Sequence, residues 1–196
     1  MAELRVARSE LILGAQNSGK TARAESLAAA WLAQSPGHRA VYVGTAQAWD
    51  EEMRERIAQH RRAGRVPRMA AVEEPLEVAH AIGRHSRADT LIVVDCLTLW
   101  LTARLVPAVP HVGAQPLAQD AIPLTGGSAT FDDALRACAG PMVLISNEIG
   151  PDAAPTGQNA RAFLASLGGL NQEAASACER VTLMSVGLPM MLKGAA

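Results

Sequence analysis

The sequence predicts an α/β fold in which helices flank a predominantly parallel central sheet. Two observations carry this prediction. Short apolar runs alternate along the chain with longer segments of helical periodicity, which is the pattern of repeated strand–helix–strand units. The run LIVVD at residues 91–95 is apolar until its last residue, as expected for a strand that is buried on both faces. We find no internal repeat, and residues 1–196 are expected to form one domain.

The first half of the chain supplies its elements in order. Residues 11–13 predict a strand, residues 19–34 a helix and residues 40–44 a second strand. Residues 50–62 predict an amphipathic helix, because Met53, Ile57 and His60 recur on one face at spacings of four and three.

The second half continues the alternation. Strands are expected at residues 91–95, 141–146 and 181–186, with a helix at residues 159–177. Residues 188–193 predict a last strand that makes an antiparallel contribution, and Pro189 in it favours the edge of the sheet. Residues 106–130 are rich in proline and glycine, so they predict a long flexible loop that could fold over an active site.

Composition narrows the class of protein. The net charge of −1 gives no support for a nucleic-acid partner, and no apolar run approaches the roughly 20 residues of a membrane span. The three cysteines lack metal-site spacing, and their odd number suits reduced thiols better than a disulfide framework. We therefore expect a soluble, cytoplasmic protein.

The segment GAQNSGKT matches the phosphate-loop pattern G-x-x-x-x-G-K-[ST] in full. Its residues are Gly14, Ala15, Gln16, Asn17, Ser18, Gly19, Lys20 and Thr21. Glycines let backbone N–H groups point at phosphate oxygens, and the helix that follows adds its amino-terminal dipole. Lys20 is expected to reach the β- and γ-phosphates of ATP or GTP, and the Thr21 hydroxyl to bind Mg²⁺. A fold like that of the P-loop nucleoside triphosphatases follows.

Asp95 ends the apolar strand and is the natural second ligand of Mg²⁺. The alternative is a strand-end aspartate that caps the next turn. Residues 146–148 (SNE) follow another expected strand but lack the lysine and aspartate of the guanine-recognition motif N-K-x-D. A regulatory GTPase is therefore disfavoured.

His60 lies in a segment dense in arginine, which includes Arg61 and Arg62. The residues alone favour simple explanations, namely a structural histidine at the end of an apolar stripe and a solvated basic face. RNA binding is a weaker explanation, because no aromatic residues are interleaved for base stacking.

The chain resembles one known family in a series of collinear runs: LILGAQNSGKTARAESLA, VYVGTAQAWDEEMRERIAQH, AAVEEPL, VVDCLTLW, LISNEIG and GGLNQ…VTLMSVGLPMMLKG. That family is the bifunctional adenosylcobinamide kinase / adenosylcobinamide-phosphate guanylyltransferase family of cobalamin biosynthesis. The resemblance implies phosphorylation of the aminopropanol hydroxyl of adenosylcobinamide by ATP or GTP. It also implies transfer of GMP from GTP, through a guanylylated histidine, to give adenosylcobinamide-GDP. It covers nearly all of the chain except residues 106–130.

By motif position the guanylylated histidine is His60, and a neutral imidazole is a good nucleophile near pH 7. Arg61 or Arg62 would steady the charge that develops on the phosphates. The resemblance places guanosine-nucleotide contacts at Thr45, Ala46, Gln47 and Glu73. Because the family forms homotrimers, we also expect a homo-oligomer.

Several positions depart from the family pattern. The usual loop GGARSGKS is replaced by one in which Asn17 stands for arginine, which removes a positive charge near the phosphates. Met69 stands for the expected tryptophan, and Leu164 and Ala165 for an Arg-Asp pair. Two other functions are compatible with the phosphate loop: a kinase of another small molecule without guanylyltransferase activity, and a non-catalytic, nucleotide-dependent regulatory module.

Overall fold

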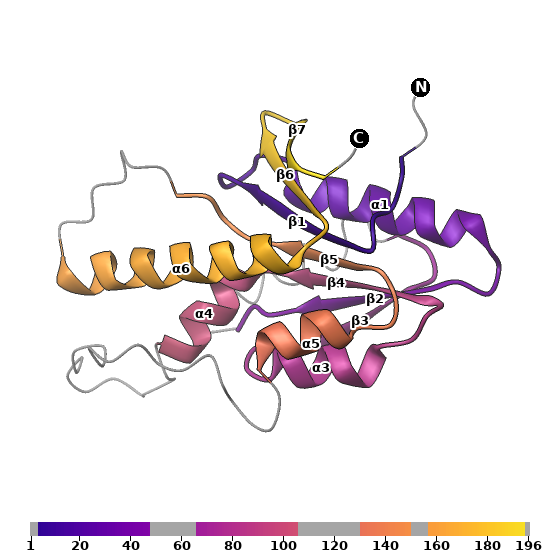
Figure 1. Cartoon of the computed structure of the whole chain (residues 1–196), viewed down its shortest axis with the longest axis horizontal. Helices are drawn as coiled ribbons and strands as arrows, with labels where there is room; N and C mark the ends of the chain where they lie inside the picture. Colours follow the sequence, from indigo (N-terminus) through magenta and orange to yellow (C-terminus); the bar gives the residue numbers. More distant parts are fainter. Residues whose placement is uncertain (1–3, 48–65, 106–129, 150–156, 195–196) are drawn as a thin grey trace.

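One seven-stranded sheet with the strand order β3-β2-β4-β5-β1-β6-β7 organises the chain (Figure 1). The computed structural model describes residues 4–47, 66–105, 130–149 and 157–194. Its strands are β1 (Ser9–Gly14), β2 (Arg39–Gly44), β3 (Met69–Glu73), β4 (Thr90–Asp95), β5 (Met142–Ile145), β6 (Arg180–Ser185) and β7 (Leu188–Lys193). Its helices are α1 (Lys20–Gln34), α3 (Val78–His85), α4 (Leu97–Leu105), α5 (Phe131–Ala137) and α6 (Gln158–Ala177).

All neighbouring strands run parallel except β6 and β7, which pair antiparallel. The carboxyl ends of β1 to β6 therefore meet at one edge of the sheet, where parallel α/β folds bind their ligands. This is the P-loop-type architecture that the sequence predicts. No helix in the described ranges is long and apolar enough to span a membrane.

Helices cover both faces of the sheet, with α1 on one face and α3, α4, α5 and α6 on the other (Figure 1). The side chains of strand β4 alternate between the two hydrophobic cores, one on each face of the sheet. Leu91 and Val93 pack in the cluster that includes α1, whereas Ile92 and Val94 pack in the cluster that includes the other four helices. Since side chains alternate along a strand, the next residue, Asp95, continues the α1 face.

Every strand that the sequence predicts is confirmed, and residues 188–193 form β7 at the edge of the sheet with the predicted bounds. The expected helix at residues 50–62 lies wholly outside the described residues, as do residues 106–129 of the expected loop. Thr130, the last residue of that loop, caps α5 through a reciprocal pair of hydrogen bonds with Asp133. Glu73 is the last residue of β3, an edge strand that the sequence did not predict.

Candidate nucleotide site

The phosphate loop connects β1 to α1 at the carboxyl edge of the sheet. Gly14 and Gly19 have positive φ values of 152° and 99°. A Cβ added at Gly14 would lie 2.5 Å from both the Met184 oxygen and the Ser18 Oγ, so only glycine fits there. Asn17 has a φ of 59°, a conformation for which asparagine is enriched among the non-glycine residues. Asn17 therefore suits the curled backbone, whatever its effect on charge.

Lys20 closes over its own loop. Its Nζ donates to the backbone oxygens of Gly14, at 2.8 Å, and of Ala15, at 2.7 Å. Burial lowers the pKa of Lys20, and the nearby acidic groups of Cys96 and Asp95 oppose that shift. A triphosphate in the loop would offer the ammonium group charged oxygens in place of the two neutral carbonyl oxygens.

Asp95 meets the phosphate loop from β4. Its Oδ2 accepts hydrogen bonds from Thr21 Oγ1 at 3.1 Å and from Tyr42 OH at 3.0 Å. The first contact links α1 to the end of β4 and joins the two residues that the sequence predicts as Mg²⁺ ligands. Burial first, then Asp95, raises the pKa of Tyr42 well above its ordinary value, so the phenol is a permanent donor to this carboxylate.

The donors at this point suit a hard cation. A hydroxyl and a carboxylate are oxygen ligands of the kind that Mg²⁺ takes beside nucleotide phosphates and water. The described residues contain no group of three or more His, Cys, Asp or Glu that could hold a metal ion alone. Thr21 and Asp95 would thus hold the ion together with the nucleotide.

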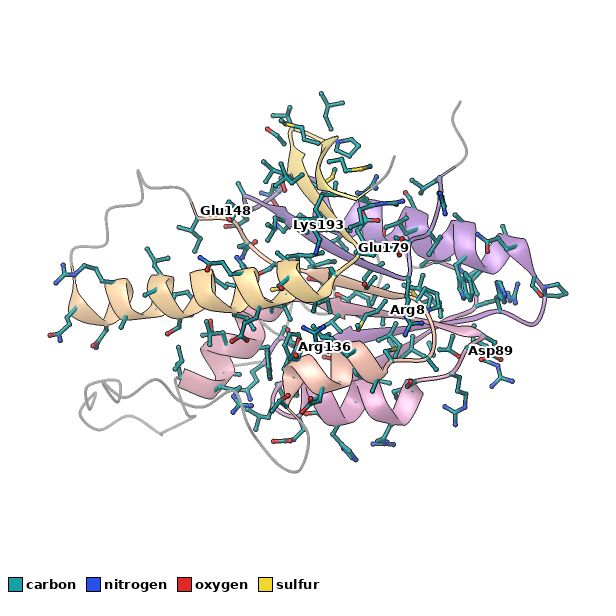
Figure 2. All side chains as sticks on the ribbon, in the orientation of Figure 1. Arg8, Asp89, Arg136, Glu148, Glu179 and Lys193 are labelled. Carbon is teal, nitrogen blue, oxygen red and sulfur yellow. The ribbon has the colours of Figure 1, made fainter. Side chains whose placement is uncertain are left out.

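Backbone hydrogen bonds from two other segments hold the phosphate loop. The backbone N–H of Glu148, which Figure 2 labels beyond the carboxyl end of β5, donates to the Gly14 oxygen at 3.1 Å. The backbone N–H of Gly187, in the turn between β6 and β7, donates to the Ser18 oxygen at 3.0 Å. Residues 146–148 lack a guanine motif, but they hold the phosphate loop in place.

The segment after β5 is itself held by two helices. The Asn147 N–H donates to Thr98 Oγ1 of α4 at 3.0 Å, and Asn171 Nδ2 of α6 donates to the Asn147 oxygen at 3.1 Å. Asn171 belongs to the run GGLNQ, so this part of the resemblance lies against the end of the sheet that carries the phosphate loop.

Thr45 follows the end of β2 and is fully buried. Its Oγ1 donates to the Cys96 oxygen at 2.7 Å and accepts from the Cys96 N–H at 2.8 Å, and its own N–H donates to the Asp95 oxygen at 3.0 Å. Thr45 thereby fixes the backbone that carries Asp95. Ala46 and Gln47 are half-buried just beyond it. Nucleotide contact by these three residues stays a prediction.

Glu73 ends β3 level with Asp95, because Gly44 of β2 pairs with both residues. A Cβ at Gly44 would lie 3.3 Å from Glu73 Oε2. The exposed Glu73 carboxylate thus reaches the same edge of the sheet as Asp95. The other predicted site residues, His60, Arg61 and Arg62, lie outside the described residues, and so their roles stay predictions.

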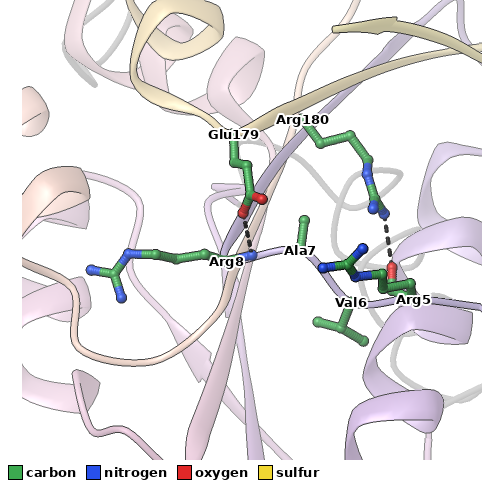
Figure 3. A pocket seen from close by; sticks show the side chains of 6 residues that line it. All are labelled: Arg5, Val6, Ala7, Arg8, Glu179 and Arg180. Atoms are coloured by element: carbon green, nitrogen blue, oxygen red, sulfur yellow. Dashed lines mark hydrogen bonds between the residues drawn. The ribbon is translucent and has the colours of Figure 1, made fainter. Parts of the chain in front are cut away.

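A pocket at the opposite end of the sheet is part of the framework (Figure 3). Its lining residues are Arg5, Val6, Ala7, Arg8, Glu179 and Arg180. The Arg8 N–H donates to Glu179 Oε2 at 3.0 Å, and Arg180 Nη1 donates to the Arg5 oxygen at 2.8 Å. These bonds tie the segment before β1 to the start of β6.

Comparison of the sequence with known proteins identifies a family that is consistent with a nucleotide site. The family model described as cobinamide kinase / cobinamide phosphate guanyltransferase matches residues 10–192. The chain belongs to this family. Its relatives in the family include the bifunctional adenosylcobalamin biosynthesis protein CobP of Pseudomonas aeruginosa, which is 40% identical over 185 residues that cover 94% of this chain and 97% of CobP. The bifunctional protein CobU of Escherichia coli is 27% identical, with 93% and 98% covered.

The cobinamide kinase family also shares its fold with distant proteins. The solved structure of the flagellar accessory protein FlaH from Methanocaldococcus jannaschii matches with a TM-score of 0.50 and 11% identity, over 96% of this chain and 80% of FlaH. An identity this low supports the shared fold alone.

The sequence analysis did not predict that Tyr42 lies beside Asp95. The sequence signal that was available is that Tyr42 is the only tyrosine and stands two residues before the end of a strand.

Proposed function

We propose that one phosphate loop in this chain serves both reactions of its family. The chain is a transferase of cobalamin biosynthesis, an adenosylcobinamide kinase and adenosylcobinamide-phosphate guanylyltransferase. The observation that carries the proposal is the closed phosphate loop, in which Lys20 stands over the loop and Thr21 is bonded to Asp95.

In the kinase step the aminopropanol hydroxyl of adenosylcobinamide attacks the γ-phosphorus of ATP or GTP. The bond to the β–γ bridging oxygen breaks, the nucleoside diphosphate leaves, and the hydroxyl proton is released. Backbone N–H groups of residues 14–21 and the Lys20 ammonium would hold the phosphate oxygens as charge moves onto the leaving group. Mg²⁺ held by Thr21 and Asp95 would neutralise part of that charge.

In the second step the imidazole of His60 attacks the α-phosphorus of GTP and expels pyrophosphate. The phosphate of adenosylcobinamide phosphate then attacks the guanylylated histidine, which forms adenosylcobinamide-GDP and regenerates His60. Arg61 or Arg62 would stabilise the phosphate charge in both half-reactions. The run RIAQH at residues 56–60, which belongs to the resemblance described above, supports this assignment, as does the guanyltransferase half of the family's description.

Labelling with GTP that carries radioactive α-phosphate tests the assignment. We expect a label on the protein that is labile in acid and stable in base, as a phosphoramidate is, and that is absent in His60→Ala. His80→Ala is the matched control and should keep the label, because His80 lies on α3, which packs on the face of the sheet opposite α1. An unlabelled wild type contradicts the transferase half, and a label that survives His60→Ala contradicts the role of His60.

Oligomer formation and location complete the proposal. β7 is an edge strand whose six residues are all exposed, with Leu188 at 65%, Met190 at 54% and Leu192 at 57%. An apolar edge strand left open is prone to pair with another chain. We expect β7 to contribute to a homotrimer contact. A cytoplasmic enzyme is consistent with the three free, buried cysteines.

A further inference from the structure

Tyr42 is the sole tyrosine of the chain, and its hydroxyl ends at the predicted metal ligand. It lies on β2, opposite Val93 of β4 in the sheet register, and its ring packs in the cluster on the α1 face. From there the ring extends along the sheet toward the carboxyl edge. Its hydroxyl and that of Thr21 donate to the same oxygen of Asp95, at 3.0 and 3.1 Å.

The surroundings of Tyr42 hold its ring in one position. Strand β2 is paired on both sides, with β3 and β4. Gly44 lies two residues further along the same face, and a Cβ there would lie 3.4 Å from Tyr42 Cε1, at van der Waals contact with the ring. A ring held by the backbone pairing and by the core gives its hydroxyl a fixed place. A carboxylate bonded to that hydroxyl is correspondingly restricted in rotation.

We infer that Tyr42 is a positioning residue, which holds the Asp95 carboxylate in the orientation where it meets Thr21 and the metal ion of a bound nucleotide. This inference rests on the proposed function, because it assumes that Asp95 binds the ion. Without the Tyr42 hydroxyl, Asp95 Oδ2 keeps its hydrogen bond from Thr21, but the carboxylate gains rotational freedom that metal binding must then remove.

Tyr42→Phe tests the inference, because it removes the hydroxyl and keeps the ring. The readout is the ratio of the dissociation constants of a non-hydrolysable ATP analogue in EDTA and in excess Mg²⁺. Wild-type protein is expected to bind more tightly with Mg²⁺. We expect Tyr42→Phe to reduce this Mg²⁺ enhancement by about fivefold, the effect of one hydrogen bond, and to leave affinity in EDTA nearly unchanged.

Thr182→Val is the matched control. Thr182 Oγ1 is buried on the same sheet and donates to a carboxylate, Glu10 Oε1, at 2.8 Å, away from the phosphate loop. The Thr182→Val substitution should lower thermal stability by about as much as Tyr42→Phe does and leave the Mg²⁺ enhancement unchanged. A Tyr42→Phe variant that behaves like Thr182→Val overturns the inference, because Tyr42 is then only a structural residue.

A second measurement does not depend on a substituted chain folding. Biosynthetic replacement of tyrosine by 3-fluorotyrosine labels only position 42, since the chain has one tyrosine. We expect its fluorine resonance to shift when Mg²⁺ is added to the complex with the ATP analogue. An unshifted resonance in a complex that does show Mg²⁺ enhancement overturns the inference alone. No Mg²⁺ enhancement in wild type overturns the role of Asp95 as well, whereas normal Mg²⁺ enhancement without phosphorylation of cobinamide contradicts only the proposed function.

Discussion

Glu10→Gln is expected to destabilise the fold by about 3 kcal/mol, because it removes the one carboxylate at the centre of a buried charged network. Glu10 is 1% exposed. Its Oε1 accepts from Arg23 Nε at 2.9 Å and from Thr182 Oγ1 at 2.8 Å, and its Oε2 accepts from Arg180 Nη1 at 3.2 Å. The network therefore ties α1 and β6 to β1, the strand that carries the phosphate loop.

The magnitude follows from burial. The Arg23 and Arg180 side chains are 12% and 7% exposed, so they would keep their charges with little water to compensate. Breaking such a buried pair by removal of one partner costs about 3–5 kcal/mol, and glutamine, which keeps the shape and one acceptor, belongs at the lower end. In a chain of this size 1 kcal/mol corresponds to roughly 2–4 °C in Tm, so we expect a fall of about 6–12 °C.

Urea unfolding followed by circular dichroism, together with calorimetry, measures this loss. Thr182→Val removes only one neutral donor to Glu10 and is expected to cost about 1 kcal/mol. A loss below about 1 kcal/mol for Glu10→Gln would refute the reasoning, because that is the range of exposed ion pairs.

The remaining predictions concern the loop, the thiols and the edge strand. Gly14→Ala should abolish binding of the ATP analogue, because its Cβ would lie 2.5 Å from the Met184 oxygen. Gly83→Ala is the control: a Cβ there meets open space, so this variant should bind the analogue normally and be at least as stable as the wild type. The Cys96 thiol is buried, and burial raises its pKa to about 11. At pH 8 it should therefore react with Ellman's reagent only after unfolding. Rapid reaction in the native protein would contradict the burial of this thiol. Leu188→Asp on β7 should convert the proposed homotrimer to a monomer in light scattering, and a mass equal to that of the wild type contradicts an interface there.

Local sequence pattern was enough for the elements that pack in the middle of the sheet. β4 is a run of apolar residues and β1 leads into a glycine loop, so both were predictable. β3 was missed because its sequence MAAVE contains three residues that are exposed at the sheet edge and little strand propensity. α4 was missed because LTLWLTARL is apolar on most sides and shows no clear stripe.

In the candidate site, the sequence predicted individual residues but not the contacts between them. Lys20, Thr21 and Asp95 follow from motif and strand end. Their convergence depends on strand order and register, which no single segment encodes. Tyr42 required both, since its contact with Asp95 arises from neighbouring strands that end level at Gly44 and Asp95. For the same reason Thr45, predicted to contact the nucleotide, also proved to fix the backbone beside Asp95.

The most direct test of one phosphate loop for two reactions is the Lys20→Met variant, assayed with α-labelled GTP and with adenosylcobinamide. Methionine keeps an unbranched side chain of nearly the same length and removes its charge. The account predicts that Lys20→Met loses about 100-fold or more in both the rate of His60 guanylylation and the rate of cobinamide phosphorylation. Loss of phosphorylation with guanylylation at the wild-type rate would contradict the account, because the two reactions would then use separate phosphate sites.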